Sequence, residues 1–266
     1  MWIVFDSGPR TGIENMQLDE WLARSWFPDT KQPVFRLYGW SPYTLSLGYH
    51  QPENDIDPEK VSKAGYGLVR RPTGGRAVLH AEEITYSVIM DATRLNVDAI
   101  YERVSSVLVS GLQAAGYAVR FAGTKQNFSS LYRDKKSVSC FTASSEYEIQ
   151  LNGRKVVGSA QRRYVREDGG VTALQHGSIL TGPKHRELVN FLTVDNTLKQ
   201  KLRNVMERSS TDLSENGARD IDSSHIKSAL INAVITELAG YDYKEYDHSY
   251  FISRMVNAEN YSTELI

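Results

Sequence analysis

The sequence predicts an α+β fold in which a mixed, mainly antiparallel sheet is backed by helices. Strand-like and amphipathic helical segments follow one another through the first half of the chain, and three strand-like runs joined by short turns come after them. The last third reads as helical. This order of elements is typical of the α+β class. The 266 residues, of which 41% are hydrophobic, suit one globular domain or one domain with an appendage.

The first half of the chain supplies two helices and most of the strands. Residues 15–27 place large apolar side chains on one face of a helix. Residues 97–115 show the same spacing more strongly, and Gly116 is placed to end that helix. Strand-like runs lie at 34–39, 44–49, 66–70, 85–90 and 117–122, with a turn at 40–42 between the first two.

A hairpin is the clearest feature of the second half. Asn152-Gly153 between the hydrophobic runs 147–151 and 155–160 is the preferred two-residue type I′ signal. A second turn at 168–170 returns the chain through 172–180. The three strands are therefore predicted to form an antiparallel meander.

After Pro183 the pattern becomes helical. Residues 223–238 predict a helix with Ser223 or Ser224 as N-cap and Gly240 just past its end. Two shorter candidate helices lie at 185–192 and 198–206. Two polar segments, predicted to be a mobile surface loop and a connector, lie at 123–137 and 207–222.

The totals argue against several classes of protein. A net charge of −1 disfavours a nucleic-acid binder, which would show a basic excess. The N-terminus has no basic segment followed by an apolar one, and no apolar run reaches the roughly 18 residues of a membrane span, so we expect neither a signal peptide nor a membrane partner. The single cysteine, Cys140, excludes an intrachain disulfide and fits a reducing compartment such as the cytoplasm. There is no Cys/His cluster at zinc spacing.

The most informative stretch runs from Arg70 to His80, with the sequence Arg-Arg-Pro-Thr-Gly-Gly-Arg-Ala-Val-Leu-His. Its glycines let the backbone take positive φ and approach a ligand closely. Its arginines offer forked donors to phosphate or carboxylate. The stretch is therefore predicted to be a loop that holds an anionic acyl carrier or a nucleotide against a sheet. A tight turn with solvated arginines is the alternative.

Cys140 is the second candidate for chemistry. It follows Arg133, Lys135 and Lys136, and nearby cations favour the reactive thiolate form. A thiolate takes an acyl group from a thioester and passes it on, which splits one transfer into two steps. The alternative is a small buried hydrophobic residue, which describes most free cysteines.

Three ordered motifs resemble the biotin/lipoate protein ligase and octanoyltransferase superfamily. Residues 70–80 resemble its Arg-Arg-x-Ser/Thr-Gly-Gly-Gly-x-Val-x-His signature, residues 153–162 resemble its lysine segment, and residues 174–180 resemble the segment that follows. The resemblance implies that superfamily's fold. It also implies a ligase-like catalytic domain over residues 1–185 and a helical C-terminal extension over residues 186–266 packed on it.

The surroundings of Cys140 narrow the resemblance. Residues 137–141 (Ser-Val-Ser-Cys-Phe), then 145–149 and Gly153-Arg154-Lys155, are similar to protein octanoyltransferases of the LipM type, whose nucleophilic cysteine occupies the matching place. The resemblance implies that Cys140 accepts octanoyl from acyl carrier protein. It then passes the group to a lysine of a lipoyl domain or of the glycine-cleavage H protein. That route requires no metal and no ATP.

Lys155 is the second catalytic residue that the resemblance implies, because the matching lysine of the superfamily contacts the acyl carbonyl or the acyl adenylate. A cation there would stabilise negative charge on the carbonyl oxygen. It would alternatively help to deprotonate the acceptor lysine. From the strand pattern alone, an exposed strand lysine is the other reading.

The remaining predicted site residues come from the same motifs. The threonine and glycines of the 70–80 loop are assigned to the pocket wall. Its first two arginines are assigned to the phosphopantetheine phosphate or to acidic patches on a carrier protein. The motif histidines would act as a general base for Cys140 or have a structural role in the sheet, and the small residues after Lys155 would leave room for the acyl chain. The full substrate-binding set is Arg70, Arg71, Thr73, Gly74, Gly75, Arg76, His80, Gly158, Ser159, Ala160, His176 and Gly177.

Two residues depart from the superfamily's pattern. Arg76 stands where ligases typically have a third glycine, and a side chain there would crowd a nucleotide, which counts against adenylate chemistry. The LipM-type enzymes share Gly-Gly-Arg at this place. Ala81 follows His80 where aspartate is usual, so a hydrogen bond that orients a histidine or an arginine would be lost.

Three other functions stay open. An ATP-dependent lipoate ligase would bind Mg-ATP and keep its activity without Cys140. An amidotransferase would move octanoyl or lipoyl between lipoylated proteins through the same thioester, so only a change of donor distinguishes it. A degenerate binding module would hold a carrier protein without turnover.

Overall fold

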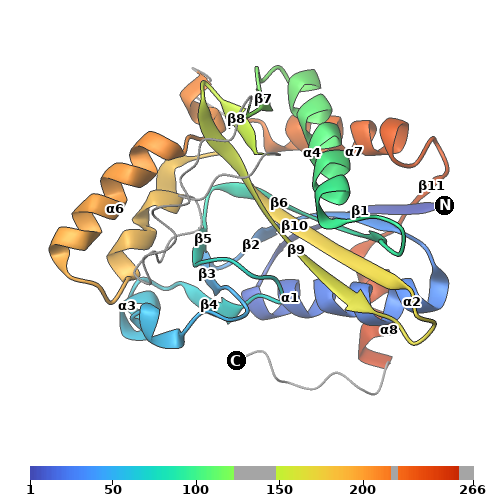
Figure 1. The fold of residues 1–266 in the computed structure, drawn as a ribbon, viewed down its shortest axis with the longest axis horizontal. Helices are drawn as coiled ribbons and strands as arrows, with labels where there is room; N and C mark the ends of the chain where they lie inside the picture. The colour runs from blue at the N-terminus through green and yellow to red at the C-terminus, as the bar shows by residue number, and fades with distance from the viewer. Residues whose placement is uncertain (123–147, 217–220, 258–266) are drawn as a thin grey trace.

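The computed structural model describes residues 1–122, 148–216 and 221–257, which form a large and a small sheet with helices around them (Figure 1). The large sheet consists of β1 (Trp2–Arg10), β2 (Val34–Trp40), β6 (Glu83–Asp91), β7 (Arg120–Phe121), β8 (Ile149–Leu151), β9 (Arg154–Val165), β10 (Val171–Leu180) and β11 (Tyr243–Glu245). The small sheet consists of β3 (Thr44–Leu47), β4 (Gly67–Arg70) and β5 (Val78–His80). The α-helices are α1 (Gly12–Trp21), α2 (Phe27–Thr30), α3 (Pro58–Lys63), α4 (Val97–Ala114), α6 (Asn196–Ser209), α7 (Ser223–Glu237) and α8 (His248–Asn257). A π-helix, η1 (Leu22–Trp26), and the 3₁₀ segments η2 (Glu53–Asp55), η4 (Pro183–Phe191) and η5 (Leu213–Asn216) complete the set.

The strand pairing confirms the predicted fold class. The large sheet has the order β11-β1-β2-β6-β10-β9-β8-β7. Among its described strands, the pairs β1–β11 and β1–β2 are parallel and the other pairs are antiparallel. In the small sheet, β3 runs parallel to β4 and antiparallel to β5. The chain is therefore an α+β protein with a mixed, mainly antiparallel sheet backed by helices.

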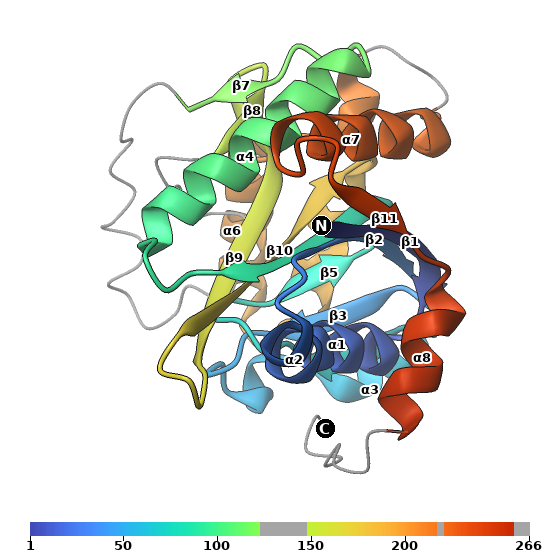
Figure 2. The same ribbon diagram turned by 90° about the vertical axis from the view of Figure 1, so that its right-hand side faces the viewer.

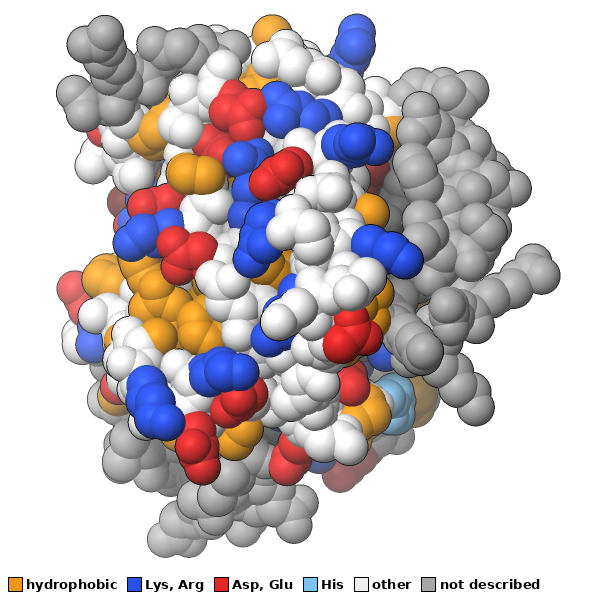
Figure 3. Space-filling model, turned by 90° about the vertical axis from the view of Figure 1, so that its left-hand side faces the viewer, with side chains coloured by type: hydrophobic (Ala, Val, Ile, Leu, Met, Phe, Trp, Pro, Cys, Tyr) orange, Lys and Arg blue, Asp and Glu red, His pale blue; other side chains and the backbone are white. Residues whose placement is uncertain are grey.

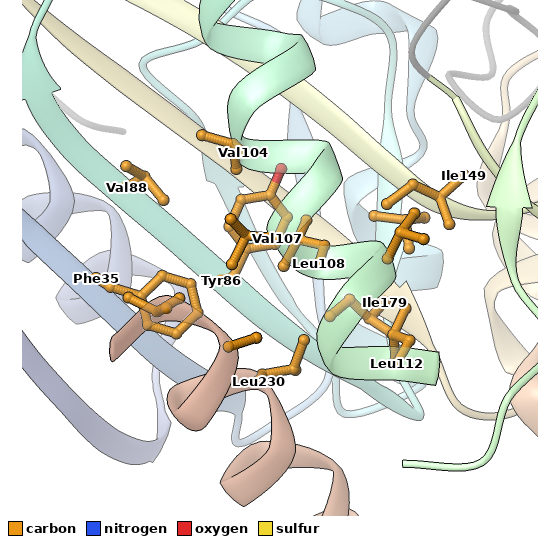
Figure 4. Close-up of a cluster of buried hydrophobic side chains, with 14 of the residues drawn as sticks. Phe35, Tyr86, Val88, Val104, Val107, Leu108, Leu112, Ile149, Ile179 and Leu230 are labelled. Carbon is orange, nitrogen blue, oxygen red and sulfur yellow. The ribbon is translucent and has the colours of Figure 1, made fainter. Parts of the chain in front are cut away.

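Helices cover both faces of the large sheet. Figure 2 shows α4 and α7 on one side and α1, α2 and α8 on the other. The inner face of α4 meets the sheet and α7 in an apolar core (Figure 4), whose members include Tyr86, Val104, Val107, Leu108, Leu112, Ile179 and Leu230. On the opposite face an aromatic cluster joins β1, α1, η1 and α8 through Phe5, Trp21, Trp26 and Phe251. These two cores hold the sheet as a rigid platform for the site.

The predicted hairpin is confirmed. Asn152 and Gly153 have φ values of 53° and 74°, and a type I′ turn requires positive φ at both positions. The turn joins β8 to β9, and β9 continues to Val165 before the chain returns as β10. The meander therefore places Lys155 near the start of a long strand whose register is fixed on both sides.

Two strands that follow each other in sequence lie in different sheets. Residues 34–40 form β2 of the large sheet, whereas residues 44–47 form β3 at the centre of the small one. β1, which the sequence analysis did not predict, lies beside β2. Its residues 2–5 are all buried, so the period-2 alternation that identifies a half-exposed strand is missing there.

The described residues 207–216 of the predicted polar connector are partly buried rather than fully exposed. α6 continues to Ser209, and Ser210, Thr211 and Asp212 are fully buried. The backbone N–H of Thr211 donates to the carbonyl oxygen of Lys155 at 2.8 Å, so this segment packs beside β9. The hydroxyl of Ser210 is satisfied inside the protein, because it donates to the carbonyl oxygen of Met206 at 2.7 Å and lies 2.9 Å from Nε2 of His185.

The C-terminal part of the chain contributes to the sheet as well as to the helices. α7 packs against α4, and β11 lies alongside β1 at the edge of the sheet. The N-cap of α7 is Asp222, one residue before the predicted serines, because its carboxylate accepts from two backbone N–H groups. The loop predicted at 123–137 lies outside the described residues, and the domain boundary at residue 185 stays a prediction. None of the helices in the described ranges is long and apolar enough to cross a bilayer.

His185, in η4, gives the fold a pH dependence. It is fully buried, and burial lowers its pKa to about 4, against about 6.5 for an exposed histidine. Between these pH values the unfolded chain binds a proton that the folded chain excludes. This contribution to stability is therefore complete above about pH 6.5, and about 3 kcal/mol is lost as the pH falls toward 4. Urea unfolding near pH 7.5 and near pH 4 should show that His185→Gln loses less stability on acidification than the wild type. Equal losses would contradict the assignment.

Candidate active site

A cavity of about 490 Å³, partly open to solvent, lies where the large sheet meets β5 and the 70–80 loop. Met16, Tyr38, Trp40 and Val78 give it an apolar wall. This lining is typical of small-ligand pockets, in which a few polar groups orient an apolar ligand. The cavity brings together eight of the predicted site residues, namely Arg71, His80, Lys155, Gly158, Ser159, Ala160, His176 and Gly177.

Arg71 braces the loop that borders this cavity. One terminal guanidinium nitrogen donates to the carbonyl and hydroxyl oxygens of Ser46 at 3.2 and 3.0 Å. The other donates to the carbonyl oxygens of Gly74 and Arg76 at 2.8 and 2.7 Å. These bonds direct the guanidinium of Arg71 at β3 and at its own loop, and so they do not support its predicted role in binding a phosphate.

The glycines of the loop serve backbone packing. Gly75 has a φ of 97°, which favours glycine, and its carbonyl oxygen lies 2.0 Å from where a Cβ on Gly48 would be. Thr73 is fully buried, with its hydroxyl oxygen 2.6 Å from Nε2 of His176. Neither these residues nor Gly74 lines the described cavity, so their part in the wall of the substrate pocket stays a prediction.

The other two arginines of the loop also lie away from the cavity wall. Arg70 donates to the carbonyl oxygens of Gly48, Tyr49 and Gln51 at 2.7–3.3 Å and forms an ion pair with Glu53. It therefore fastens the turn after β3. Arg76 is half-buried, and the structure gives its side chain no hydrogen bond or ion pair to the described residues, so its predicted contact with substrate stays a prediction.

Lys155 lies in the cavity wall and is largely buried. Its Nζ is 2.7 Å from Oε1 of Glu148, and the two side chains are 12% and 5% exposed. The contact is an ion pair by distance rather than a well-angled hydrogen bond. The reading of Lys155 as an exposed strand lysine is therefore wrong. A cation held away from bulk water acts strongly on negative charge that develops near it.

Small residues form the part of the cavity beside Lys155. In the β9–β10 pairing, Gly177 lies opposite Ser159. A Cβ on Gly177 would lie 2.4 Å from the carbonyl oxygen of Gly158 and 2.8 Å from Oγ of Ser159, so only glycine fits. The hydroxyl of Tyr86 is 2.6 Å from the same Oγ, and burial raises the pKa of Tyr86 to about 12. These small residues therefore line the cavity, and its floor is hydrogen-bonded in place. That an acyl chain occupies this space stays a prediction.

His176 is held between a carboxylate and the loop. Its Nδ1 lies 3.2 Å from Oδ2 of Asp19, and its Nε2 meets Thr73. Burial would raise the pKa of Asp19, but the charge of Arg36 at 2.7 Å and hydrogen bonds to the carboxylate hold it below its usual value. Burial lowers the pKa of His176, so the ring is neutral near pH 7, donates from Nδ1 to Asp19 and accepts from Thr73.

His80 is held in a similar way. Its Nε2 lies 2.8 Å from Oγ of Ser46, its Nδ1 lies 2.9 Å from Oε1 of Glu83, and its ring stacks on Trp40 with 4.0 Å between centroids. Glu83 thus supplies a carboxylate in place of the aspartate that is usual in the superfamily at the position of Ala81. Both motif histidines are thus held by side chains. The structural and general-base roles both stay predictions, because Cys140 lies outside the described residues.

Cys140 and the basic residues before it lie outside the described residues, so the nucleophile stays a prediction. Within the described ranges, no group of three or more His, Cys, Asp or Glu residues is arranged to hold a metal ion. The described site therefore offers an apolar cavity, a buried lysine and a braced loop. These features suit an acyl group whose carbonyl lies near Lys155.

Three buried carboxylates were missed by the sequence analysis. Asp19, Glu83 and Glu148 each contact one predicted site residue. Glu148 lies in the segment 145–149 that resembles the octanoyltransferases, and Glu83 lies three residues after His80, so both were within reach of a local pattern. Asp19 is 157 residues from His176, and no pattern along the chain connects them.

Comparison with known proteins agrees with this geometry. Residues 11–235 match the family model of the lipoyl protein ligase A/B catalytic domain. The chain is 40% identical over 210 residues to the octanoyltransferase LipM of Macrococcus caseolyticus, covering 76% of this chain and 74% of that protein. It is 39% identical over 238 residues to the octanoyltransferase LipM of Anoxybacillus flavithermus, covering 86% and 84%.

A solved structure shows the same fold. The bipartite lipoate protein ligase of Thermoplasma acidophilum matches with a TM-score of 0.73 over 99% of this chain and 94% of that one, at 19% identity. Fold and site together define a catalytic domain of the lipoate ligase class. The chain belongs to the lipoyl protein ligase A/B catalytic-domain family.

Proposed function

We propose that this chain is a protein octanoyltransferase. It moves an octanoyl group from acyl carrier protein, through a thioester on Cys140, to the ε-amine of a lysine in a lipoyl-accepting protein. The observation that carries the proposal is the apolar cavity with Lys155 buried in its wall, in a chain 40% identical to an octanoyltransferase. The product is an octanoyl amide, on which lipoate is then assembled.

The transfer consists of two acyl exchanges. The Cys140 thiolate attacks the thioester carbonyl, the bond from that carbonyl to the phosphopantetheine sulfur breaks, and this sulfur leaves and takes up a proton. The acceptor amine then attacks the new thioester, loses a proton and displaces the Cys140 thiolate as the amide forms. In both exchanges negative charge builds on the carbonyl oxygen, where the Lys155 ammonium stabilises it.

This route needs no nucleotide and no metal, because the donor is already an activated thioester. Arg76 supports that assignment. It occupies the place of the third glycine that ligases of the superfamily typically have, and a side chain there leaves less room for a nucleotide. The reaction belongs in the cytoplasm, where reducing conditions keep a single cysteine as a thiol.

Acyl carrier protein is the proposed donor, and a lipoyl domain or the glycine-cleavage H protein is the proposed acceptor. Acyl carrier proteins and lipoyl domains are usually acidic. The face that carries α3 and α6 has Lys and Arg side chains interspersed with Asp and Glu (Figure 3). An acidic partner would therefore be recognised through local charge pairs rather than through one large basic field.

The first test uses purified full-length chain and octanoyl-acyl carrier protein without ATP. We expect intact mass to show one octanoyl group, a peptide map to place it on Cys140, and addition of acceptor H protein to remove it. Modification of the acceptor only when ATP and free octanoate are supplied would contradict the proposal and make the chain a ligase. Faster acylation of Cys140 by an octanoylated H protein than by octanoyl-acyl carrier protein would make it an amidotransferase.

A further inference from the structure

We propose that Glu83 is a positioning residue, which fixes the loop beside the acyl cavity through His80, Ser46 and Arg71. These four side chains form a chain of hydrogen bonds in which each donor and acceptor is determined. Glu83 does not line the acyl cavity, so it acts through His80 rather than on the acyl group. The activity test of this inference rests on the proposed function, but its structural test does not.

Arg71 determines which atoms donate and which accept in this series of hydrogen bonds. A guanidinium only donates, so Ser46 Oγ, 3.0 Å from its nitrogen, is an acceptor in that contact. Ser46 is fully buried, and its own hydroxyl hydrogen needs an acceptor. Among the described residues, the remaining partner of this hydroxyl is Nε2 of His80 at 2.8 Å. Ser46 therefore donates to His80, and Nε2 carries no hydrogen.

The donor and the acceptor between His80 and Glu83 follow from this assignment. With Nε2 as the acceptor, the ring hydrogen lies on Nδ1, which donates to Oε1 of Glu83 at 2.9 Å. The ring lies flat against Trp40, with an interplanar angle of 12°, which fixes its orientation. Trp40 in turn donates from Nε1 to the hydroxyl of Thr85 at 2.7 Å.

Glu83 is held by one of its two oxygens. Oε1 accepts from Thr85 at 2.6 Å and from Ser178 at 2.8 Å, in addition to His80. Oε2 is buried and has no partner among the described residues. Glu83 lies in the wall of a second, solvent-open hollow, whose lining shares Tyr38, Trp40 and His80 with the acyl cavity. The protein therefore uses this side chain as a multiple acceptor at a single oxygen.

This asymmetry predicts that the acceptor atom matters and the charge does not. In Glu83→Gln the amide oxygen takes the place of Oε1 and keeps all three donors, while the amide nitrogen takes the place of the unpartnered Oε2. In Glu83→Met the side chain keeps a similar length but the acceptor is lost. The two variants are therefore a matched pair.

The structural test is the tautomer of His80, read from the imidazole ¹⁵N chemical shifts of the labelled full-length chain without substrate. The signals are assigned by their loss in His80→Gln. We expect hydrogen on Nδ1 in the wild type and in Glu83→Gln, and a shift toward the other tautomer in Glu83→Met. Ser46→Ala, which removes the hydrogen bond to the other nitrogen of the His80 ring, should also shift the tautomer. Hydrogen on Nε2 in the wild type, or no change in either Glu83→Met or Ser46→Ala, would overturn the inference.

The activity test compares kcat/KM for octanoyl transfer. Misplacing a site element by a fraction of an ångström to an ångström lowers rates on the order of 10- to 100-fold, which we expect for Glu83→Met. Glu83→Gln should restore most of this loss. If Glu83→Gln were as impaired as Glu83→Met, while His80 kept hydrogen on Nδ1, the charge of Glu83 would be needed and the positioning role would be wrong. Loss of transfer in the wild type itself would refute the proposed function and leave the tautomer result unaffected.

Discussion

Replacing Cys140 with alanine is expected to stop octanoyl transfer, with a fall of at least about 10⁴-fold in kcat. In the proposed route, the substitution removes the atom that carries the acyl group between the two exchanges. The octanoyl-acyl carrier protein mixture should then leave the mass of the chain unchanged. Transfer to the H protein, followed by mass spectrometry over time, measures the loss.

Ser139→Ala is the control for this substitution, because it changes the same segment and keeps the thiol. Thermal unfolding of both variants shows whether the fold is intact. Full transfer in Cys140→Ala would refute the covalent route. If that transfer required ATP and free octanoate, the chain would be a ligase in which the cysteine has no chemical part.

The elements that could be predicted are those defined by residues close together in the sequence. The Asn152-Gly153 turn fixes its own geometry through two positive φ values, and the apolar spacing of residues 97–115 is sufficient to define α4. Lys155 and Gly177, both taken from the motif resemblance, line one cavity, because they belong to neighbouring strands of a meander whose turns could be identified in the sequence.

Contacts made between distant segments were not predictable. The ion pair of Asp19 with Arg36 joins α1 to β2 and then reaches His176 on β10, and no spacing along the chain connects these three residues. The pairing of β1 with β2 and β11 is equally non-local.

The 70–80 loop shows a different limit of sequence reasoning. Its arginines and glycines suggest ligand binding by residue type alone. In the structure Arg70 and Arg71 donate mainly to backbone carbonyl oxygens, and Gly75 packs against Gly48. A guanidinium donates to protein carbonyl oxygens as readily as to a phosphate. Residue composition therefore does not distinguish an arginine that stabilises a loop from one that binds a ligand.

Replacing Lys155 with methionine is expected to lower kcat by about 10²- to 10³-fold, as the loss of one oxyanion donor does. Methionine keeps an unbranched side chain in the cavity wall but removes the cation that is proposed to face the carbonyl oxygen. Arg154→Met is the matched control. Arg154 is the preceding residue on β9, its guanidinium pairs with Glu215, and alternate residues of a strand point to opposite faces. That variant should keep most of its activity.

The two half-reactions separate the two roles considered for Lys155. Acylation of Cys140 is followed by stopped-time mass spectrometry without acceptor, and deacylation is followed by adding the H protein to the isolated acyl-enzyme. Charge stabilisation acts on the same carbonyl oxygen in both steps, so Lys155→Met should slow both to a similar extent. Slowing of deacylation alone would assign Lys155 to the removal of the acceptor amine's proton, because that proton exists only in the second step. Equal activity of Lys155→Met and Arg154→Met would show that the buried cation takes no part in the chemistry.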